Sequence, residues 1–329
     1  MIRVRPLFVM LFGLLAVSLI LSLLNGSVTL PLSSFWQDLV GESGGVTASV
    51  IRELRLSRAE TAFVVGALLA LAGVLMQALL RNPLADPYVL GISGGAAALA
   101  LVAMLLGLGM VWVQGGALIG ALLSMFLVFG LAHGRGQWTA TRLLLTGVVI
   151  AAGWGAIISF MLSISPDQNL RSMLFWLMGD IGYESPSLIT WLILGLGLVL
   201  ALSLARSLNL LVRGEQQAAA LGVDVRRLRL QIYFLASMLT GMAVMLAGTI
   251  GFIGLIVPHS VRLLAGADHR VVLPASVLLG GSLLMLADML ARTIVAPQQL
   301  PVGVVTALIG VPVFLLLLFR NASVSARVG

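Results

Sequence analysis

The chain has 329 residues, of which 60% are hydrophobic and only 9% are charged. That balance excludes a single water-soluble core, because so few polar residues cannot cover so much apolar surface, and it predicts a membrane protein. The formal net charge is +7, but the sequence has no cluster of basic and aromatic residues on which nucleic-acid bases could stack. We therefore expect the positive charge to lie beside anionic membrane lipid and do not expect nucleic acid as a partner. The chain has no cysteine, which excludes disulfides, thiolate metal sites and cysteine nucleophiles.

A transmembrane helix needs about 20 apolar residues, and several charge-free runs meet or approach that length. In chain order they are Pro6–Gln37, Thr61–Leu80, Pro87–Ala132, Leu143–Pro166, Ser185–Ala205, Leu230–Pro258, Val271–Ala287 and Thr293–Phe319. The third and sixth runs can each fold back once, because glycines interrupt them near residues 107–109 and 248–254. We therefore predict an all-α polytopic membrane protein with ten transmembrane helices and a single domain, 1–329.

Every basic residue is arginine, and with ten spans 14 of the 19 fall on one side of the membrane. These are Arg3, Arg5, Arg81, Arg135, Arg142, Arg206, Arg213, Arg226, Arg227, Arg229, Arg262, Arg270, Arg320 and Arg327. The positive-inside rule then places both termini in the cytoplasm. Reading 230–261 as one span would move four of these arginines outside, which favours the even count.

Between the fifth and sixth predicted spans, segment 165–184 carries apolar residues at helical spacing, among them Leu170, Met173 and Leu174. We expect a short helix at the outer mouth. On the opposite side, segment 206–229 is a polar, basic stretch within an otherwise apolar chain. Gly214 permits a turn there, and Glu215 favours the N-terminus of a helix. This pattern indicates a cytoplasmic docking element, with a solvated basic loop as the alternative.

Four blocks of sequence together resemble the permease subunits of ATP-driven importers for ferric siderophores, haem and cobalamin. They are Arg55–Gln77 with its Arg-Leu-Ser-Arg start, Asn82–Pro87 followed by Leu90–Ala96, Gly214–Gly222, and Gly251–His259 continuing through Arg262, Asp268–Arg270, Asp288, Arg292 and Pro301–Phe314. The chain departs from the family at two positions. The family usually has proline where Ser57 stands, and Glu60 is more polar than the residue that the family usually has there. The resemblance covers nearly the whole chain, in order and with its spacing kept.

This resemblance implies the type II ABC importer permease fold in a bacterial cytoplasmic (inner) membrane. It also implies a permease dimer, either a homodimer with a second copy of this chain or a heterodimer with a different permease, together with two cytoplasmic ATPase subunits and a periplasmic or extracellular substrate-binding protein. The chain has no phosphate-binding loop of the G-x-x-x-x-G-K-[ST] type, so ATP and Mg belong to the partner ATPase. We expect a transport permease that is not an enzyme and that binds no cofactor or metal itself.

Arg55, Arg58 and Arg292 match family positions that meet acidic residues of the binding protein, and arginine suits this because its planar fork binds carboxylates bidentately. The alternatives are interfacial anchoring or, for Arg292, an ion pair with Asp288 one helical turn back. At the inner side, the resemblance assigns the ATPase-coupling helix to a set of residues in segment 206–229. They are Gly214, Glu215, Ala218, Leu221 and Gly222.

Asn82, Leu84, Ala140 and Thr141 lie at inferred cytoplasmic span ends, where related permeases close their pathway. The alternative for Asn82 is a simple helix stop before proline. Arg171 in the outer segment is either an attractor of an anionic chelate or an interfacial anchor.

Two other functions remain open from the residues alone. An ion-coupled secondary transporter needs buried titratable groups, and Asp288 is the only carboxylate well inside a predicted span. An intramembrane serine protease would need Ser93 within reach of His259. We expect His259 and His269 in a cytoplasmic loop, too sparse for a metal site.

Overall fold

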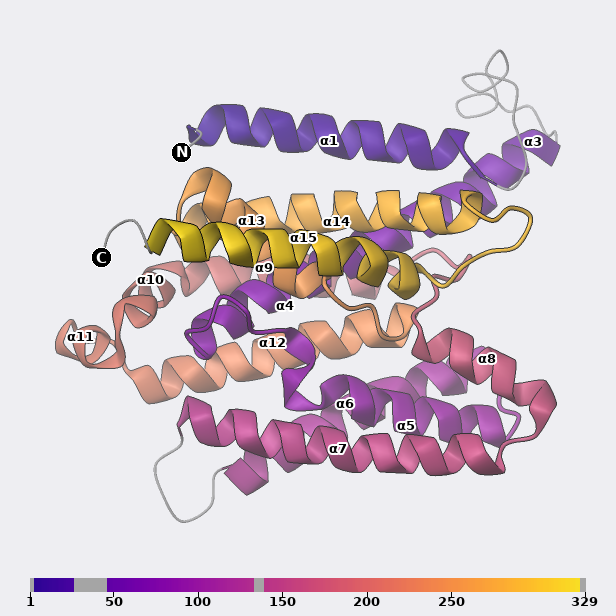
Figure 1. Cartoon of the computed structure of the whole chain (residues 1–329), viewed down its shortest axis with the longest axis horizontal. Coiled ribbons are helices and arrows are strands. Elements are labelled where there is room, and N and C mark those ends of the chain that lie inside the picture. Colours follow the sequence, from indigo (N-terminus) through magenta and orange to yellow (C-terminus); the bar gives the residue numbers. More distant parts are fainter. Residues whose placement is uncertain (1–2, 27–45, 133–138, 326–329) are drawn as a thin grey trace.

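A computed structural model of the chain describes residues 3–26, 46–132 and 139–325, and every regular element in those residues is helical. The long helices run along one common axis (Figure 1). The elements are α1 (Val4–Leu24), α3 (Val46–Ser49), η1 (Val50–Leu56), α4 (Ser57–Leu79), η2 (Pro87–Leu90), α5 (Ile92–Leu105), α6 (Met110–Ala132), α7 (Ala140–Ile164), α8 (Asp167–Leu177), α9 (Leu188–Ser203), α10 (Ala205–Arg213), α11 (Glu215–Ala220), α12 (Val225–Ala247), α13 (Ile253–Ala265), α14 (His269–Thr293) and α15 (Val302–Ser325).

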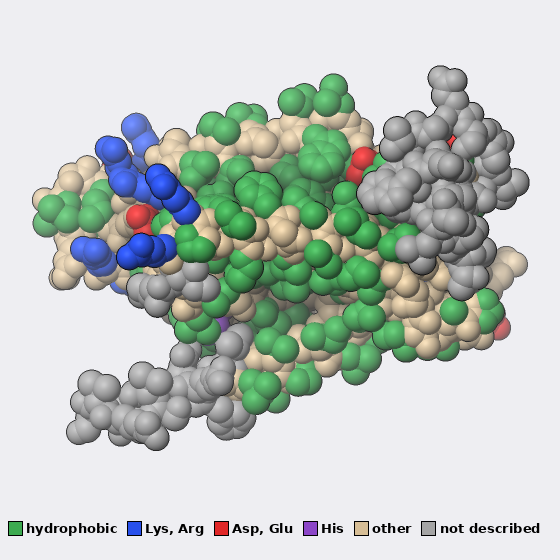
Figure 2. Space-filling model, turned by 90° about the horizontal axis from the view of Figure 1, so that it is seen from above, with side chains coloured by type: hydrophobic (Ala, Val, Ile, Leu, Met, Phe, Trp, Pro, Cys, Tyr) green, Lys and Arg blue, Asp and Glu red, His purple; other side chains and the backbone are tan. Residues whose placement is uncertain are grey.

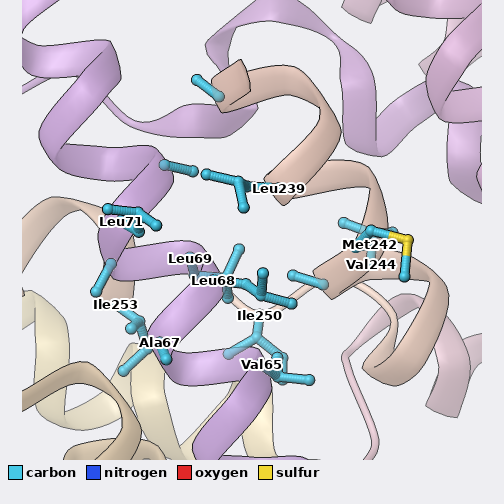
Figure 3. Close-up of a cluster of buried hydrophobic side chains, with 14 of the residues drawn as sticks. Val65, Ala67, Leu68, Leu69, Leu71, Leu239, Met242, Val244, Ile250 and Ile253 are labelled. Carbon is cyan, nitrogen blue, oxygen red and sulfur yellow. The ribbon is translucent and has the colours of Figure 1, made fainter. Parts of the chain in front are cut away.

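Helix α4 is the core of the molecule, because nearly every side chain along it is buried. It packs against α12, α13 and α14, and Figure 3 shows its leucines meeting residues of α12 and the turn that follows. Glycine makes this contact possible: a Cβ on Gly66 would lie 2.3 Å from the Gly280 carbonyl oxygen of α14. A Cβ on Gly73 would lie 1.9 Å from that of Gly254 in α13. Small residues thus bring the backbones together where apolar burial alone gives no driving force.

Helices α5, α6 and α7 form a second packed group. A Cβ on Gly95 would lie 2.4 Å from the Gly120 carbonyl oxygen, so α5 and α6 touch through glycine. Gly91, which has φ 71°, faces Ala151 of α7. The break between α5 and α6 falls at residues 106–109, as the glycines there predict. The glycine-rich face of α5 is therefore used for helix packing.

The helices have the length and composition of membrane spans. Within the described residues, 6 helices are long and apolar enough to cross, and the pair α9–α10, bent by 56°, is a seventh candidate. Three shorter apolar helices lie in α5, α13 and α15. Figure 2 shows arginine side chains gathered at one end of the molecule, with apolar side chains dominating the middle. The chain is a multi-pass helical membrane protein.

The structure corrects the expected boundary after α12. The sequence predicts a second span ending at Pro258 and a loop holding His259 and Arg262, but α13 runs through all three residues. Proline inside a helix leaves the carbonyl four residues earlier without its partner. Here that carbonyl, on Gly254, accepts instead from Gln77 Nε2 of α4 at 3.3 Å. A side chain of another helix thus supplies the donor that Pro258 cannot.

Candidate coupling and gating site

The polar segment 206–229 covers two short helices, α10 and α11, and the start of α12. The two short helices project at the end of the molecule where α1 begins and α15 ends (Figure 1). Gly214 separates them with φ 134°, a conformation that strains any residue with a Cβ. Ala218 of α11 is buried, whereas Leu221 just beyond it is 67% exposed. Helix α11 therefore packs one face on the molecule and presents an apolar residue outward.

The end of α11 is defined by a hydrogen-bonded glycine cap. Val223 N donates to Ala218 O at 3.0 Å and Gly222 N donates to Ala219 O at 3.0 Å, while Gly222 has φ 84°. This is the Schellman pattern, in which a glycine in the left-handed region ends the helix. Asp224 then accepts from Arg227 N at 3.0 Å and caps α12. Residues Gly214 and Gly222 thus fix where α11 starts and stops.

Glu215, the first residue of α11, pairs with two arginines from other elements. Arg81 Nη2 lies 3.0 Å from Glu215 Oε1, and Arg229 of α12 contacts the same oxygen. The carboxylate also sits at a helix N-terminus, where negative charge is favoured. These ion pairs link α11 to α12 and to the turn that follows α4.

That turn, Arg81–Leu84, holds two of the expected gate residues. Asn82 N donates to Gln77 O at 3.1 Å and Arg81 N donates to Ala78 O at 3.3 Å, so α4 also ends in a Schellman pattern. Arg81, with φ 47°, holds the left-handed position that glycine usually fills in this pattern. A residue with a Cβ costs roughly 1–2 kcal/mol in that conformation. Asn82 Oδ1 accepts from Leu84 N at 2.9 Å, and the Leu84 side chain is exposed.

Ala140 and Thr141 form the first turn of α7, at the same end of the molecule as the α4 turn (Figure 1). Thr139 caps this helix by accepting from Arg142 N at 3.3 Å. The Thr141 side chain is exposed. Both predicted gate segments thus lie at the α11 end, where their role stays a prediction.

A hydrogen-bonded link also joins α10 to α14. Asn209 Nδ2 donates to Asp268 Oδ1 at 2.8 Å, and Asn209 Oδ1 accepts from His269 N at 2.9 Å. The bond from Asn209 and that from Arg270 N lower the pKa of Asp268, which caps α14. The α10–α11 arm is therefore attached to α4, α12 and α14 through polar contacts.

At the opposite end, the three arginines expected to face a binding protein are buried. Arg58 Nε lies 2.9 Å from Asp288 Oδ1, and Arg292 Nε lies 3.0 Å from Asp288 Oδ2. Asp288 is fully buried, so one carboxylate is held between two guanidinium groups. The pairing of Arg292 with Asp288 is the alternative that their spacing along the helix predicts. Arg55 donates to Leu23 O at 2.7 Å and to Leu24 O at 2.8 Å, at the end of α1.

Further groups complete this outer cluster. Arg58 reaches Asp180 at 3.4 Å and Gln299 Oε1 at 3.3 Å, and its guanidinium lies 5.0 Å from the centre of the Tyr183 ring. Burial raises the pKa of Asp180 against the opposing effect of Arg58. In this conformation the arginines stabilise contacts within the chain, and docking through them stays a prediction.

Arg171 lies on α8, within the segment for which the sequence predicts a short helix. Its guanidinium is 5.6 Å from the centre of the Phe175 ring. With Asp180 it lines a cavity of about 380 Å³ at the end opposite α11. The sequence did not predict Asp180 as a partner of Arg58, nor Arg81 and Arg229 as partners of Glu215. The only local sign of the Glu215 pairing was that Arg81 directly precedes Asn82-Pro83.

The residues required for the protease alternative lie on different parts of the bundle. Ser93 is on α5, which packs on α6 and α7, whereas His259 is on α13, which packs on α4 and α14. No group of three or more His, Asp or Glu side chains that could hold a metal occurs in the described residues.

The fold and the paired polar ends define the class, a polytopic helical membrane protein with a short interfacial arm at one end.

The chain belongs to the FecCD transport family, whose model matches residues 14–320. It is 40% identical to the hemin transport system permease protein HmuU of Yersinia pestis, covering 97% of each chain. It is also 40% identical to the vitamin B12 import system permease protein BtuC of Klebsiella pneumoniae subsp. pneumoniae, over 94% of this chain and 93% of the other. A solved structure assigned to the metal-chelate type of ABC transporter, in an inward-facing conformation, matches with a TM-score of 0.83 and 32% identity, covering 97% of this chain and all of that one.

Proposed function

We propose that this chain is the membrane permease subunit of an ATP-driven, binding-protein-dependent importer of a metal chelate, working by alternating access. The observation that carries the proposal is the α10–α11 arm. Two glycines with positive φ bound a short helix, and Glu215 ties its first turn to the turn that holds Asn82 and Leu84. A push on α11 would therefore reach the candidate gate directly.

The family relationship supports the partners. Two cytoplasmic ATPases would receive α11, a binding protein would deliver cargo at the Arg58 end, and a second permease copy would complete the path. Relatives named for hemin and for vitamin B12 are equally similar and so do not separate these two cargoes. The cargo that we propose is a ferric siderophore, haem or cobalamin. ATP and Mg would act on the partner ATPase.

The membrane arrangement we propose has ten spans. It takes the six long helices and the bent pair α9–α10 together with the shorter α5, α13 and α15. With an even count both termini lie on the α11 side, and the positive-inside rule makes that side cytoplasmic. The arginines in Figure 2 gather at that end. Of the 14 arginines in the topology argument, Arg135 and Arg327 lie outside the described residues.

Reconstituted transport tests this function. The chain, its cognate ATPase and its binding protein are placed in proteoliposomes loaded with ATP and offered ferric siderophores, haem and cobalamin in turn. We expect uptake of one cargo that requires both partners. Uptake that needs neither partner and collapses with the proton gradient would instead establish the ion-coupled transporter.

Charge reversal at Glu215 tests the coupling role. Glu215→Arg would face Arg81 and Arg229 with a third positive charge, so we expect co-purification of the ATPase and uptake to fall severalfold while membrane insertion is kept. Glu215→Gln is the milder control, because it removes the ion pairs without repulsion. Unchanged ATPase binding and transport in Glu215→Arg would count against coupling through α11.

A further inference from the structure

The turn 248–252, between α12 and α13, is non-helical backbone that lies beside the middle of α4. A Cβ on Gly254, two residues further on, would lie 3.0 Å from the carbonyl oxygen of Leu69, which is near the centre of α4. Figure 3 shows Ile250 of this turn close to Leu68. Peptide groups at such a depth in a membrane have no water to bind, so other groups of the protein must satisfy them.

One side chain satisfies both peptide groups of Ile250. The Tyr88 hydroxyl of η2 donates to Ile250 O at 3.1 Å and accepts from Ile250 N at 3.1 Å. Ile250 is 1% exposed, so loss of the hydroxyl would remove these bonds from an N–H and a carbonyl in the protein interior. Pro87 packs beside the same region, since a Cβ on Gly254 would lie 2.7 Å from Pro87 Cδ. The Tyr88 hydroxyl therefore binds η2 to the turn 248–252.

Helix η2 follows the Arg81–Leu84 turn in the chain and is tied to it by short-range hydrogen bonds. Ala85 N donates to Asn82 O at 3.1 Å, and Asp86 Oδ1 accepts from Tyr88 N at 2.8 Å. The chain from Asn82 to Tyr88 is thus a short segment with its own hydrogen bonds. A displacement of Tyr88 would therefore displace the turn that precedes it.

On its other side, the turn 248–252 contacts the last residues of α8, which lies at the end of the molecule opposite α11 (Figure 1). Thr249 Oγ1 donates to Leu177 O. A Cβ on Gly248, which has φ 65°, would lie 2.2 Å from the Trp176 carbonyl oxygen. The two backbones touch with no side chain between them, so a shift of α8 would displace the turn in this close-packed interior.

Backbone strain occurs in the same turn. Phe252 has φ 70°, in the left-handed region that a bulky side chain rarely adopts. It is held there by α15, because a Cβ on Gly310 would lie 2.7 Å from Phe252 Cβ. Strained residues persist where surrounding contacts hold them, and they cluster in segments that switch between conformations. The strain at Phe252 is therefore a second observation, independent of Tyr88, that favours a functional role for this turn.

We propose that the turn 248–252 connects α8 to the Arg81–Leu84 turn during transport, and that Tyr88 is the positioning residue of this connection. The inference rests on the proposed function, in which α8 lies at the outer mouth, the Arg81–Leu84 turn lies at the cytoplasmic gate, and the two must not open together. Through the turn, movement at one end is passed to the other within a single subunit. Tyr88 acts in this role through the backbone of Ile250.

Tyr88→Phe removes only the hydroxyl, and Tyr233→Phe is its matched control. Tyr233, in the first half of α12, donates to Met125 O of α6 at 2.6 Å, also in the interior. Each variant loses a hydrogen bond to a backbone carbonyl, so we expect both to fold and to lower Tm in detergent by about 2 °C. A difference between the two in the measurements below is therefore not a difference in stability.

Single thiols report on each end, because the chain has no cysteine of its own. Leu84→Cys places a thiol in the exposed turn, and Ser172→Cys places one on an exposed position of α8. The rate of labelling by a water-soluble maleimide is measured on the chain bound to its cognate ATPase in detergent, with and without a non-hydrolysable ATP analogue.

We expect the ATP analogue to change both labelling rates severalfold in the wild-type background and in Tyr233→Phe. In Tyr88→Phe only the rate at Leu84→Cys should change. The reason is that Glu215 of α11 contacts the Arg81–Leu84 turn directly, whereas the response of α8 depends on the turn 248–252. A Ser172→Cys rate that responds in Tyr88→Phe, or that fails to respond in the wild-type background, would overturn the inference.

Uptake per ATP hydrolysed is the second readout, measured in proteoliposomes with the ATPase and the binding protein. We expect this ratio to fall severalfold in Tyr88→Phe and to stay near the wild-type value in Tyr233→Phe. A ratio that Tyr88→Phe keeps, or that both variants lose equally, would overturn the role of Tyr88 and leave the transport function intact. A wild-type chain that takes up none of the three cargoes with ATP would overturn the transport function, and this inference with it.

Discussion

The two ends of the molecule use the same ionic motif in opposite settings. At one end Asp288 lies between Arg58 and Arg292, with exposed side-chain fractions of 0%, 1% and 5%. At the other end Glu215 lies between Arg81 and Arg229, with fractions of 32%, 43% and 11%. Each motif joins three charges from separate positions of the chain, but only the first is withdrawn from solvent.

This difference in burial predicts a difference in role. A buried carboxylate between two arginines has no water to replace it when it is lost, so removing the carboxylate leaves two buried positive charges facing each other. A half-exposed ion pair contributes about 0–1 kcal/mol, because water screens it and resolvates its members when it breaks. The Asp288 triad therefore locks α4 to α14, whereas the Glu215 triad can break and re-form during a conformational cycle.

The largest expected effect comes from breaking the buried triad. Asp288→Ala leaves Arg292 without its counter-ion and Arg58 with Asp180 alone, at 3.4 Å, and we expect a loss of about 3–5 kcal/mol of stability. The measurement is thermal unfolding of the purified chain in detergent, together with its yield in the membrane. Asp180→Asn is the control, because Asp180 is 44% exposed and its loss should cost about 1 kcal/mol or less.

A fully apolar replacement sharpens this result. Combining Arg58→Met, Asp288→Leu and Arg292→Met removes all three charges together, and such replacements are often neutral or stabilising. We expect the triple variant to recover most of the stability that Asp288→Ala loses. Stability as low as that of Asp288→Ala would show that packing, rather than charge, is what this position requires.

The two triads also show what sequence reasoning can reach. Local patterns predicted the Arg292–Asp288 pair one helical turn apart, the turn at Gly214 before α11, and the break between α5 and α6. They missed the bonds of Arg58 to Asp180 and of Glu215 to Arg81, because those partners are more than 100 residues apart in the chain. The presence of Pro258 led to a wrong prediction of where this span ends. Helix α13 continues past the proline because Gln77 donates to the carbonyl that the proline leaves without a partner. Long-range polar pairing leaves no periodic signal.

The next effect separates stability from coupling at Arg81. Arg81→Gly removes the strain of φ 47° but also removes the pair with Glu215, so the net change in stability should be within about 1 kcal/mol. ATP-dependent uptake in proteoliposomes should nevertheless fall severalfold, because α11 loses its link to the turn. Arg81→Lys keeps the charge and should retain more uptake. An Arg81→Gly variant that transports as well as the wild type would argue that the link is only structural.

The smallest expected effect concerns Asp86, just after the Arg81–Leu84 turn. Burial raises the pKa of its carboxyl to about 6, against the opposing hydrogen bond from Tyr88 N at 2.8 Å. The folded chain then binds this proton more tightly than the unfolded chain, so stability falls as pH rises from about 4 to about 6 and is level above that range.

Asp86→Asn keeps the acceptor for Tyr88 N and removes the charge. We expect the variant to be more stable than wild type at pH 7.5, by about 1 kcal/mol or less because the side chain is partly exposed, and to lose that advantage near pH 4. Thermal unfolding at both values measures this, and an advantage that is the same at both would show that the Asp86 charge is not the cause.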